Sequence, residues 1–349
     1  MIKLKPDIKL IVDFLNAHPG ASSKEIYDGT SIDLVSYVTL QRLLKSFVEK
    51  SYLTAKGLGK GTKYYVNIAY QVIHEVNIEE YFKKEIDERI INRTYNQDLI
   101  RNVLNKIEIF SQDEIEKLND LQKLYETKMM RLNEVEYKME LERLAIDLSW
   151  KSSQIEGNTY SLLETERLLK NKETAAGKTK DEAVMLLNHK KAIDFLVEHQ
   201  DYVKPLTLKA IEDIHSILIG ELDIERNLRK RSVGITGTNY RPLENEFQIK
   251  EALEEMCGLI NLRENVFEKA LLAILIISYI QPFNDGNKRT ARIVSNSLLM
   301  VNHYCPISFR TIDSTEFKMA MLIFYEQNNI SAFKKIFIDQ FEFAVNTYF

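Results

Sequence analysis

The chain has 349 residues, 45% hydrophobic and 28% charged, with only six prolines and twelve glycines. This composition favours a helix-rich globular protein of two or three domains, and it excludes long disordered or low-complexity tracts. The formal net charge is −4, but residues 1–63 hold ten Lys or Arg against six Asp or Glu, so any contact with nucleic acid is expected there.

The cysteines and the apolar runs bear on localisation. Cys257 and Cys305 are the only cysteines, too few for a disulfide framework or a cysteine metal site, and the N terminus has no signal pattern. The longest apolar run, Ala270 to Ile280, is shorter than the about 20 residues that cross a bilayer. We therefore expect a cytoplasmic protein without membrane contact, in which this run is a buried helix.

The first 70 residues combine helical and strand patterns. Apolar residues recur at helical spacing over 8–18, "SSKEIYD" carries a capping-box pattern, and "SYVTLQRLLKSFVEKSYL" has one apolar helix face. "YLTAKGLGKGTKYYV" then fits two short strands around a turn rich in Gly and Lys. This order predicts a winged helix-turn-helix domain over residues 1–70.

Two functions stay open for that domain. The polar face of residues 36–45, with Lys56, Lys60 and Lys63 of the turn, suits DNA contact. The same module could instead bind a protein and leave its basic face in solvent. DNA binding would weaken steeply with added salt.

The chain after residue 70 is predicted to be almost entirely helical. Residues 71–144 form a charged connecting segment, which we expect to contain two or more long helices and no site. Further helical patterns cover 160–170, 179–199, 207–220, 246–262, 266–280, 286–302, 314–327 and 331–346. One exception, "KRSVGITGTNYRP" from Lys230 to Pro242, has the alternation and glycines of a small β-hairpin, whose exposed edge could pair with a peptide strand.

The stretch "SYIQPFNDGNKRTAR", residues 278–292, interrupts the apolar run with a polar turn and then restarts a helix. Gly286 and Asn287 precede a helix N terminus, where unpaired N–H groups bind anions. Asp285 suits Mg²⁺ held between phosphates, and Arg289 and Arg292 share one helix face. The alternative is a capped helix start with surface charges, in which Asp285 only stabilises the N terminus.

This stretch resembles the motif of the Fic family, His-x-Phe-x-Asp/Glu-Gly-Asn-Gly/Lys-Arg-x-x-Arg. The positions that fit are Pro282, Phe283, Asp285, Gly286, Asn287, Lys288, Arg289 and Arg292. The resemblance covers residues 145–349 and implies a mainly α fold: a Fic-type helical bundle with a small β-hairpin flap, here preceded by the winged helix. Fic proteins typically transfer AMP from ATP to a Ser, Thr or Tyr hydroxyl of a target protein, which is unknown for this chain.

The resemblance also implies roles for single residues. Asp285 would ligate Mg²⁺, the turn at 286–288 would cradle the α-phosphate, and Arg289 and Arg292 would grip the outer phosphates. Phe283 would anchor the turn in the core. The segment that resembles the target-docking flap is Val233, Gly234, Ile235, Thr236 and Gly237. Its alternative is an ordinary surface hairpin.

A second match lies upstream in "SSQIEGN". Ser152, Glu156 and Gly157 fit the inhibitory motif of the family, Ser/Thr-x-x-x-Glu-Gly/Asn, at the end of a predicted helix over about 145–157. The resemblance implies that Glu156 pairs with Arg292 and obstructs the productive position of the γ-phosphate. A capped helix end with a solvated Glu is the alternative.

Gln281 departs from the family pattern, because it stands where the motif has its catalytic His. An amide cannot accept the proton of the target hydroxyl, and general-base help is commonly worth about 10²–10⁴ in rate. We therefore predict an adenylyltransferase that is self-inhibited by Glu156 and impaired by Gln281, with ATP and Mg²⁺ as ligands. Among the histidines, only His215 merits examination as a replacement base.

A regulator is the second function that the sequence leaves open. In it the Fic fold only senses nucleotide, and the winged helix acts on DNA or on a protein partner. The long helices are compatible with a homodimer, and adenine contacts are expected within residues 317–329, without assignment to single side chains.

Overall fold

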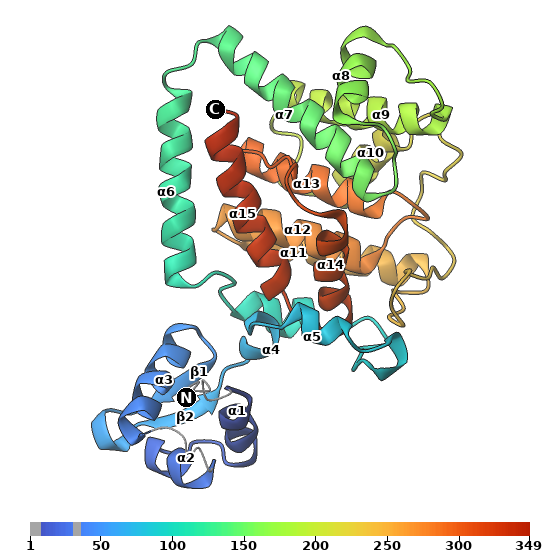
Figure 1. Cartoon of the computed structure of the whole chain (residues 1–349). Coiled ribbons are helices and arrows are strands. Elements are labelled where there is room, and N and C mark those ends of the chain that lie inside the picture. The colour runs from blue at the N-terminus through green and yellow to red at the C-terminus, as the bar shows by residue number, and fades with distance from the viewer. Residues whose placement is uncertain (1–7, 31–35) are drawn as a thin grey trace. The chain divides into compact units, whose positions relative to one another are not determined.

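The computed structural model describes residues 8–30 and 36–349, and of Lys60 only the backbone. The chain is mainly helical, which confirms that prediction (Figure 1). It divides into an N-terminal unit, residues 1–75 with 106–115, and a helical unit, residues 76–105 with 116–349. Among the described residues, no helix combines the length and apolar character needed to cross a membrane.

As far as the structure describes them, residues 8–66 of the N-terminal unit hold three α-helices, a 3-10 turn at Gly59–Gly61 and a two-stranded antiparallel sheet. The elements are α1 (Ile8–Ala17), α2 (Ser23–Gly29), α3 (Tyr37–Glu49), β1 (Leu53–Lys56) and β2 (Lys63–Val66). The predicted capping box is present at α2, since the Ser22 side chain accepts from the Glu25 amide and the Glu25 side chain accepts from the Ser22 amide. The elements follow the order predicted for a winged helix, although residues 1–7 and 31–35 of that prediction lie outside the described part.

The connecting segment is less helical than predicted. Before residue 112 it holds only short elements: α4 (Tyr70–Ile73), α5 (Ile78–Phe82), 3-10 turns at Ile86–Glu88 and Leu104–Lys106, and a π turn at Leu99–Val103. The two long helices of the prediction begin later, as α6 (Gln112–Met129) and α7 (Glu134–Ile155). Asparagine side chains contribute to this difference, because they bond to nearby backbone: Asn96 accepts from the Asp98 amide and Asn105 donates to the Arg101 carbonyl.

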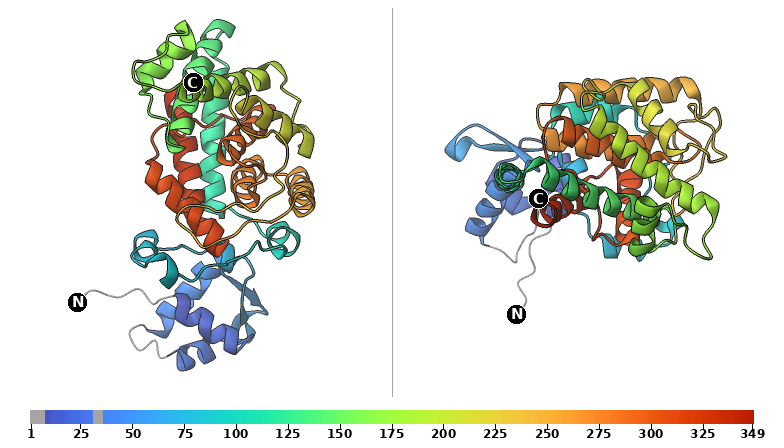
Figure 2. Two further views of the ribbon diagram at one scale, coloured as in Figure 1. Left: turned by 90° about the vertical axis from the view of Figure 1, so that its right-hand side faces the viewer. Right: turned by 90° about the horizontal axis from the view of Figure 1, so that it is seen from above.

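The helical unit continues with eight helices that match the predicted patterns closely. They are α8 (Leu162–Asn171), α9 (Lys180–Glu198), α10 (Leu208–Leu218), α11 (Glu246–Leu262), α12 (Val266–Ile280), α13 (Asn287–Val301), α14 (Ser314–Gln327) and α15 (Ser331–Thr347). From Phe267 onward α12 is buried on almost every side, and it packs most extensively against α13. In Figures 1 and 2, the other helices of the unit surround this pair. The turn between α12 and α13 therefore starts from a deeply buried part of the unit.

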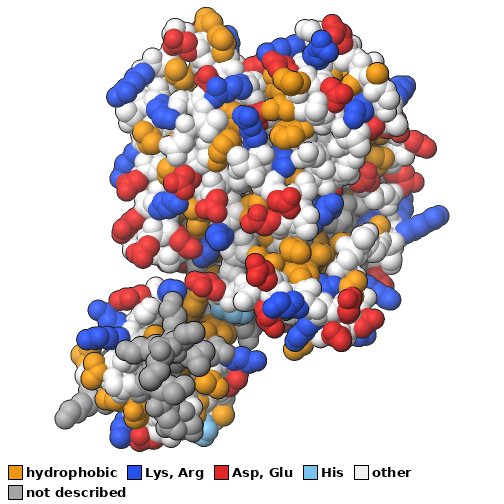
Figure 3. All heavy atoms as spheres, viewed as in Figure 1, with side chains coloured by type: hydrophobic (Ala, Val, Ile, Leu, Met, Phe, Trp, Pro, Cys, Tyr) orange, Lys and Arg blue, Asp and Glu red, His pale blue; other side chains and the backbone are white. Residues whose placement is uncertain are grey.

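Helix α6 lies along α15 at the edge of the helical unit (Figure 2). Lys117 pairs with Glu342 at 2.6 Å, and Lys128 Nζ donates to the Val345 carbonyl at 2.7 Å. Acidic and basic side chains are interspersed over the face of the unit that Figure 3 shows. That face therefore presents no broad field of one sign.

The predicted hairpin at residues 230–242 is wrong as a strand pair. The two arms of the segment form no ladder, and its one bridge is a parallel pairing of Arg241 with Thr94. The physical reason lies in its short apolar alternation: Val233 and Ile235 are only half-buried, and the Arg241 amide donates to the Arg93 carbonyl instead of to the opposite arm. The segment is a loop that is held by its surroundings.

Candidate functional site

The polar turn between α12 and α13 is closed by its own side chains. Gln281 takes a left-handed conformation (φ 50°) directly after the last residue of α12, and Gly286 (φ 80°) precedes α13. Asn287 joins the two ends, since its Oδ1 accepts from the Phe283 amide at 2.8 Å and its Nδ2 donates to Gln281 Oε1 at 3.0 Å. The Asn287 side chain thus shapes the turn, and only its backbone amide remains to contribute to an anion cradle.

Phe283 and His215 stabilise the turn from its buried side. Phe283 is fully buried and stacks on the ring of His215, with 3.6 Å between the centroids and 3° between the planes. His215 Nε2 lies 3.0 Å from the Asp285 carbonyl oxygen, which fits a donated hydrogen bond. Burial lowers the pKa of His215 to about 4, so the ring is neutral at pH 7. His215 holds the turn in place and is not a replacement base within the cavity.

A cavity of about 500 Å³ opens over this turn. Four parts of the helical unit line it: the end of α7, residues 234–236, the turn with the start of α13, and α14. The lining residues are Ile155, Glu156, Gly157, Gly234, Ile235, Thr236, Gln281, Asn284, Asp285, Gly286, Asn287, Lys288, Arg289, Lys318, Met321, Leu322 and Tyr325. Its size falls in the range of small-molecule sites. The predicted motif residues from Asp285 to Arg289 form its floor, whereas Arg292 does not line it.

The floor of the cavity is suited to bind an anion. Within the described part of the chain, no side chain caps the N terminus of α13, so the first amides of this helix keep their hydrogen-bonding capacity. Arg289 and Arg292 are buried, yet Arg289 Nε and Nη1 and Arg292 Nη1 have no hydrogen-bond partner among the described residues. Buried donors without partners are costly, and phosphate oxygens would satisfy them.

Glu156 already occupies part of this cationic site. Its Oε1 accepts from Arg292 Nη2 at 2.9 Å, and its Oε2 accepts from Lys288 Nζ at 3.1 Å. Ser152 holds the same arginine, because its Oγ accepts from Arg292 Nε at 2.8 Å. Burial alone would raise the pKa of Glu156, but the charges and hydrogen bonds of Arg292 and Lys288 outweigh it and lower that pKa. The carboxylate therefore stays ionised at neutral pH and competes with any phosphate for Arg292.

The side-chain amide of Gln281 forms hydrogen bonds to neighbouring residues of the chain. Its Nε2 donates to the Ser278 carbonyl at 2.6 Å, while its Oε1 accepts from Asn287. The side chain lines the cavity, but both ends of the amide already have partners. It could act on an incoming hydroxyl only after giving up one of these bonds.

Asp285 is the one carboxylate of the turn that could hold a metal ion. Its side chain is 64% exposed, with Oδ1 accepting from the Gly286 amide at 2.6 Å and Oδ2 lying 3.3 Å from Arg289 Nη2. The described residues contain no group of three His, Cys, Asp or Glu that could hold a metal by itself. A single carboxylate fits Mg²⁺ that arrives with phosphates and keeps several waters.

Sequence reasoning placed some residues at the cavity and missed others. Gly234, Ile235 and Thr236 line it, whereas Val233 and Gly237 do not. Helix α14 forms one wall of the cavity with Lys318, Met321, Leu322 and Tyr325. The sequence had indicated only the region 317–329, without single residues. The sequence analysis also missed Arg229, whose buried Nε donates to the Gln281 carbonyl at 2.6 Å. No motif or spacing in the sequence pointed to this arginine.

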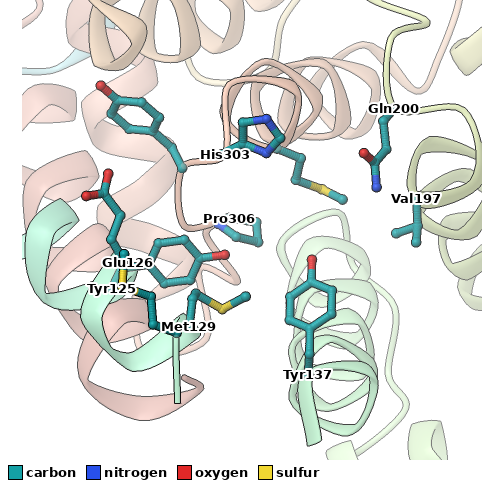
Figure 4. A pocket seen from close by; sticks show the side chains of 11 residues that line it. Tyr125, Glu126, Met129, Tyr137, Val197, Gln200, His303 and Pro306 are labelled. Atoms are coloured by element: carbon teal, nitrogen blue, oxygen red, sulfur yellow. The ribbon is translucent and has the colours of Figure 1, made fainter. Parts of the chain in front are cut away.

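A second cavity, of about 390 Å³, lies away from the motif, where α6 and α7 meet the ends of α9 and α13 (Figure 4). Tyr125 and Tyr137 point into it from opposite sides, together with Met129. Its lining residues are Tyr125, Glu126, Met129, Met130, Tyr137, Val197, Gln200, Met300, His303, Tyr304 and Pro306. Because Lys and Arg are missing from this lining, the cavity over the turn is the better phosphate site.

Comparisons with known proteins find sequence similarity over part of the chain. The sequence model of the Fic/DOC family matches residues 205–299. The chain is 31% identical over 167 residues to the protein adenylyltransferase Fic of Culex quinquefasciatus, and 26% identical over 162 residues to the protein adenylyltransferase fic-1 of Caenorhabditis elegans. These matches cover 45% and 44% of this chain, but only 32% and 31% of those proteins.

Solved structures show the same fold at low sequence identity. Residues 134–508 of C. elegans Fic-1 match with a TM-score of 0.58 at 20% identity, over 68% of this chain and 72% of that one. A Fic-domain signaling protein from Bacteroides thetaiotaomicron matches with a TM-score of 0.57 at 21% identity, over 66% of this chain and 94% of that one. The mainly helical fold with one small antiparallel sheet is thus Fic-like. Over residues 205–299 the chain is thus similar to the Fic/DOC family, and over less than half of its length it resembles the protein adenylyltransferases named Fic.

Proposed function

We propose that this chain binds ATP in the cavity over the turn and transfers AMP slowly to a protein hydroxyl, under inhibition by Glu156. The observation that carries the proposal is the pair of buried arginines, Arg289 and Arg292, whose unpartnered N–H groups adjoin an uncapped helix N terminus. Such a site demands an anion, and the family relation makes a nucleotide the natural one.

Each residue of the site has a role that follows from its position. The amides at the start of α13 bind the α-phosphate, and Arg289 and Arg292 bind the phosphates beyond it. Asp285 would hold Mg²⁺, which supplies neutralisation of phosphate charge when bound. The target oxygen forms a bond to the α-phosphorus as the bond to the leaving pyrophosphate breaks. Since Gln281 cannot accept the hydroxyl proton, that proton passes to water, and transfer is slow.

Inhibition follows from the contacts of Glu156. A γ-phosphate placed on Arg292 would meet an ionised carboxylate that already has two hydrogen bonds to the same cationic site. Removal of Glu156 therefore frees Arg292 for the γ-phosphate and is expected to raise transfer.

A nucleotide-sensing regulator is the second candidate, favoured by the committed amide of Gln281. Its output would come from the N-terminal unit, where several basic side chains are neutralised locally: Lys24 pairs with Asp28, Lys45 with Glu49 and Lys63 with Glu25. Apolar side chains are exposed on the same unit, with Val38 of α3 at 55% and Leu58 between the strands at 92%. These features favour a protein partner over DNA.

An AMP-transfer assay distinguishes the two candidate functions. Labelled AMP transfer to the chain itself and to lysate proteins would be compared for the parent chain, Glu156→Gly, Gln281→His and the double variant. We expect the double variant to be the most active, with Gln281→His adding about 10² or more over Glu156→Gly alone. A double variant that binds ATP but transfers nothing would overturn the enzyme proposal in favour of the regulator.

A further inference from the structure

Arg89, a buried arginine of the connecting segment, contacts Gly237 and Glu326, which follow directly after two groups of cavity-lining residues, 234–236 and those of α14. Its Nη2 donates to the carbonyl of Gly237 at 2.9 Å, and its Nη1 lies 3.1 Å from Glu326 Oε1 of α14. Both side chains of this ion pair are buried, and Tyr81 donates a further hydrogen bond to Glu326 Oε2 at 2.6 Å. A buried ion pair needs such additional partners, because taking its charges out of water is costly.

Residues on both sides of Arg89 form hydrogen bonds to the same two segments, one between side chains and two between backbone groups. Asn239 Nδ2 donates to Asp87 Oδ1 at 3.0 Å, and the Arg241 amide donates to the Arg93 carbonyl at 2.9 Å. The Asn92 amide donates to the carbonyl of Glu326 at 2.8 Å. Residues 87–94 therefore join the second arm of segment 230–242 to the end of α14.

Segment 230–242 is anchored in its second arm by Tyr240, which is buried and whose hydroxyl donates to the Tyr279 carbonyl at 2.9 Å. Its base is held by Arg229, whose Nη1 donates to the Arg231 carbonyl at 2.7 Å and whose Nη2 donates to the Leu243 carbonyl at 2.5 Å. Between these points the segment lacks a strand ladder. At Gly237 (φ 90°) it meets α14 so closely that an added Cβ would lie 3.3 Å from Leu322 Cδ1. Arg89 fixes the segment at this point.

We propose that Arg89 is a positioning residue for target docking: it fixes Gly237, and with it residues 233–236, at a set distance from α14. This proposal rests on the function proposed above, since it assigns residues 233–236 to the target. Residues 93–94 already pair with Arg241, which leaves the arm at 233–236 as the edge open to an incoming strand. If Arg89 only stabilised the fold, its replacement would not change the position of residues 233–236.

The test is Arg89→Lys, which keeps a positive charge beside Glu326 but cannot hold both Glu326 and Gly237 with one ammonium group. The measurement is hydrogen exchange of a peptide covering residues 237–243, in which the Tyr240 and Arg241 amides are hydrogen-bonded. We expect their exchange to become roughly tenfold faster, while α12 is unchanged. Arg93→Lys is the matched control and should change neither, because Arg93 is exposed and contributes its backbone.

A second readout separates positioning from stability. In the Glu156→Gly, Gln281→His background, Arg89→Lys should lower AMP transfer roughly tenfold and leave the Kd for ATP within about twofold, because the arginines of α13 are untouched. Unchanged exchange at 237–243 would overturn the proposal, as would a parallel loss of ATP affinity and transfer. If the background itself transfers no AMP, the proposed function fails, but the exchange result still decides the role of Arg89.

Arg89→Lys could also fail to fold. The double variant Arg89→Gln, Glu326→Gln then replaces it, because it removes both charges and leaves no lone buried ion. A glutamine at position 89 is too short to reach Gly237, so the same faster exchange at 237–243 is expected. Wild-type exchange in this double variant would contradict the proposal.

Discussion

At the scale of single residues, the site depends on side chains whose partners lie far away in the sequence. Glu156 and Arg292 are 136 positions apart, yet they form one ion pair with Ser152 beside it. The sequence motifs indicated that pair only through resemblance to a family. Spacing alone could not, because long-range contacts depend on how the helices pack.

His215 shows a residue whose surroundings decide its role. Burial lowers its pKa from 6.5 to about 4, so the folded chain binds fewer protons than the unfolded chain between these pH values. Stability is therefore expected to fall as the pH drops from about 6.5 to about 4, by on the order of 3 kcal/mol from this group, and to lose nothing more from it below that.

The comparison with His215→Phe measures this contribution. Chemical denaturation at several pH values between 4 and 7 should give the variant a shallower pH dependence than the parent chain, even if its stability at pH 7 is lower. Parallel curves for the two proteins would show that His215 is not buried in its neutral form.

At the scale of elements, helix patterns were predictable and loops were not. The eight helices from α8 to α15 match their predicted ranges to within about three residues at either end, because each has a continuous apolar stripe. The segment 230–242 and residues 75–111 were mistaken, since their amides find partners in other segments that a local pattern cannot reveal. The turn before α13 was predictable because its Gly and Asn have strong local preferences.

The start of α13 offers a test of the cradle as an element. Gly286→Ala places a Cβ 3.4 Å from the His215 ring at a φ of 80°, so we expect a loss of about 1–2 kcal/mol in stability and weaker ATP binding. Gly258→Ala in α11 is the control, because its site is helical and open. It should add about 0.5–1 kcal/mol and leave ATP binding unchanged. If calorimetry gave equal ATP affinity for both variants, the turn before α13 would not be a phosphate-binding element.

At the scale of the whole molecule, the cavity is assembled from α7, residues 234–236, the turn with α13, and α14. The connecting segment, for which the sequence predicted no chemistry, joins Gly237 to Glu326 of α14 through Arg89. Its importance was hidden because an isolated arginine in a charged segment resembles a solvated side chain. Only the packed structure shows that it is buried.

The competition between Glu156 and the γ-phosphate is the central claim, and nucleotide titration tests it most directly. ATP and ADP would be titrated calorimetrically against the parent chain and against Glu156→Gly. Because Glu156 makes a charge-assisted hydrogen bond to Arg292, its removal should tighten ATP about tenfold or more and ADP much less. An unchanged ratio of ATP to ADP affinity, or a loss of ATP binding in Glu156→Gly, would contradict the account.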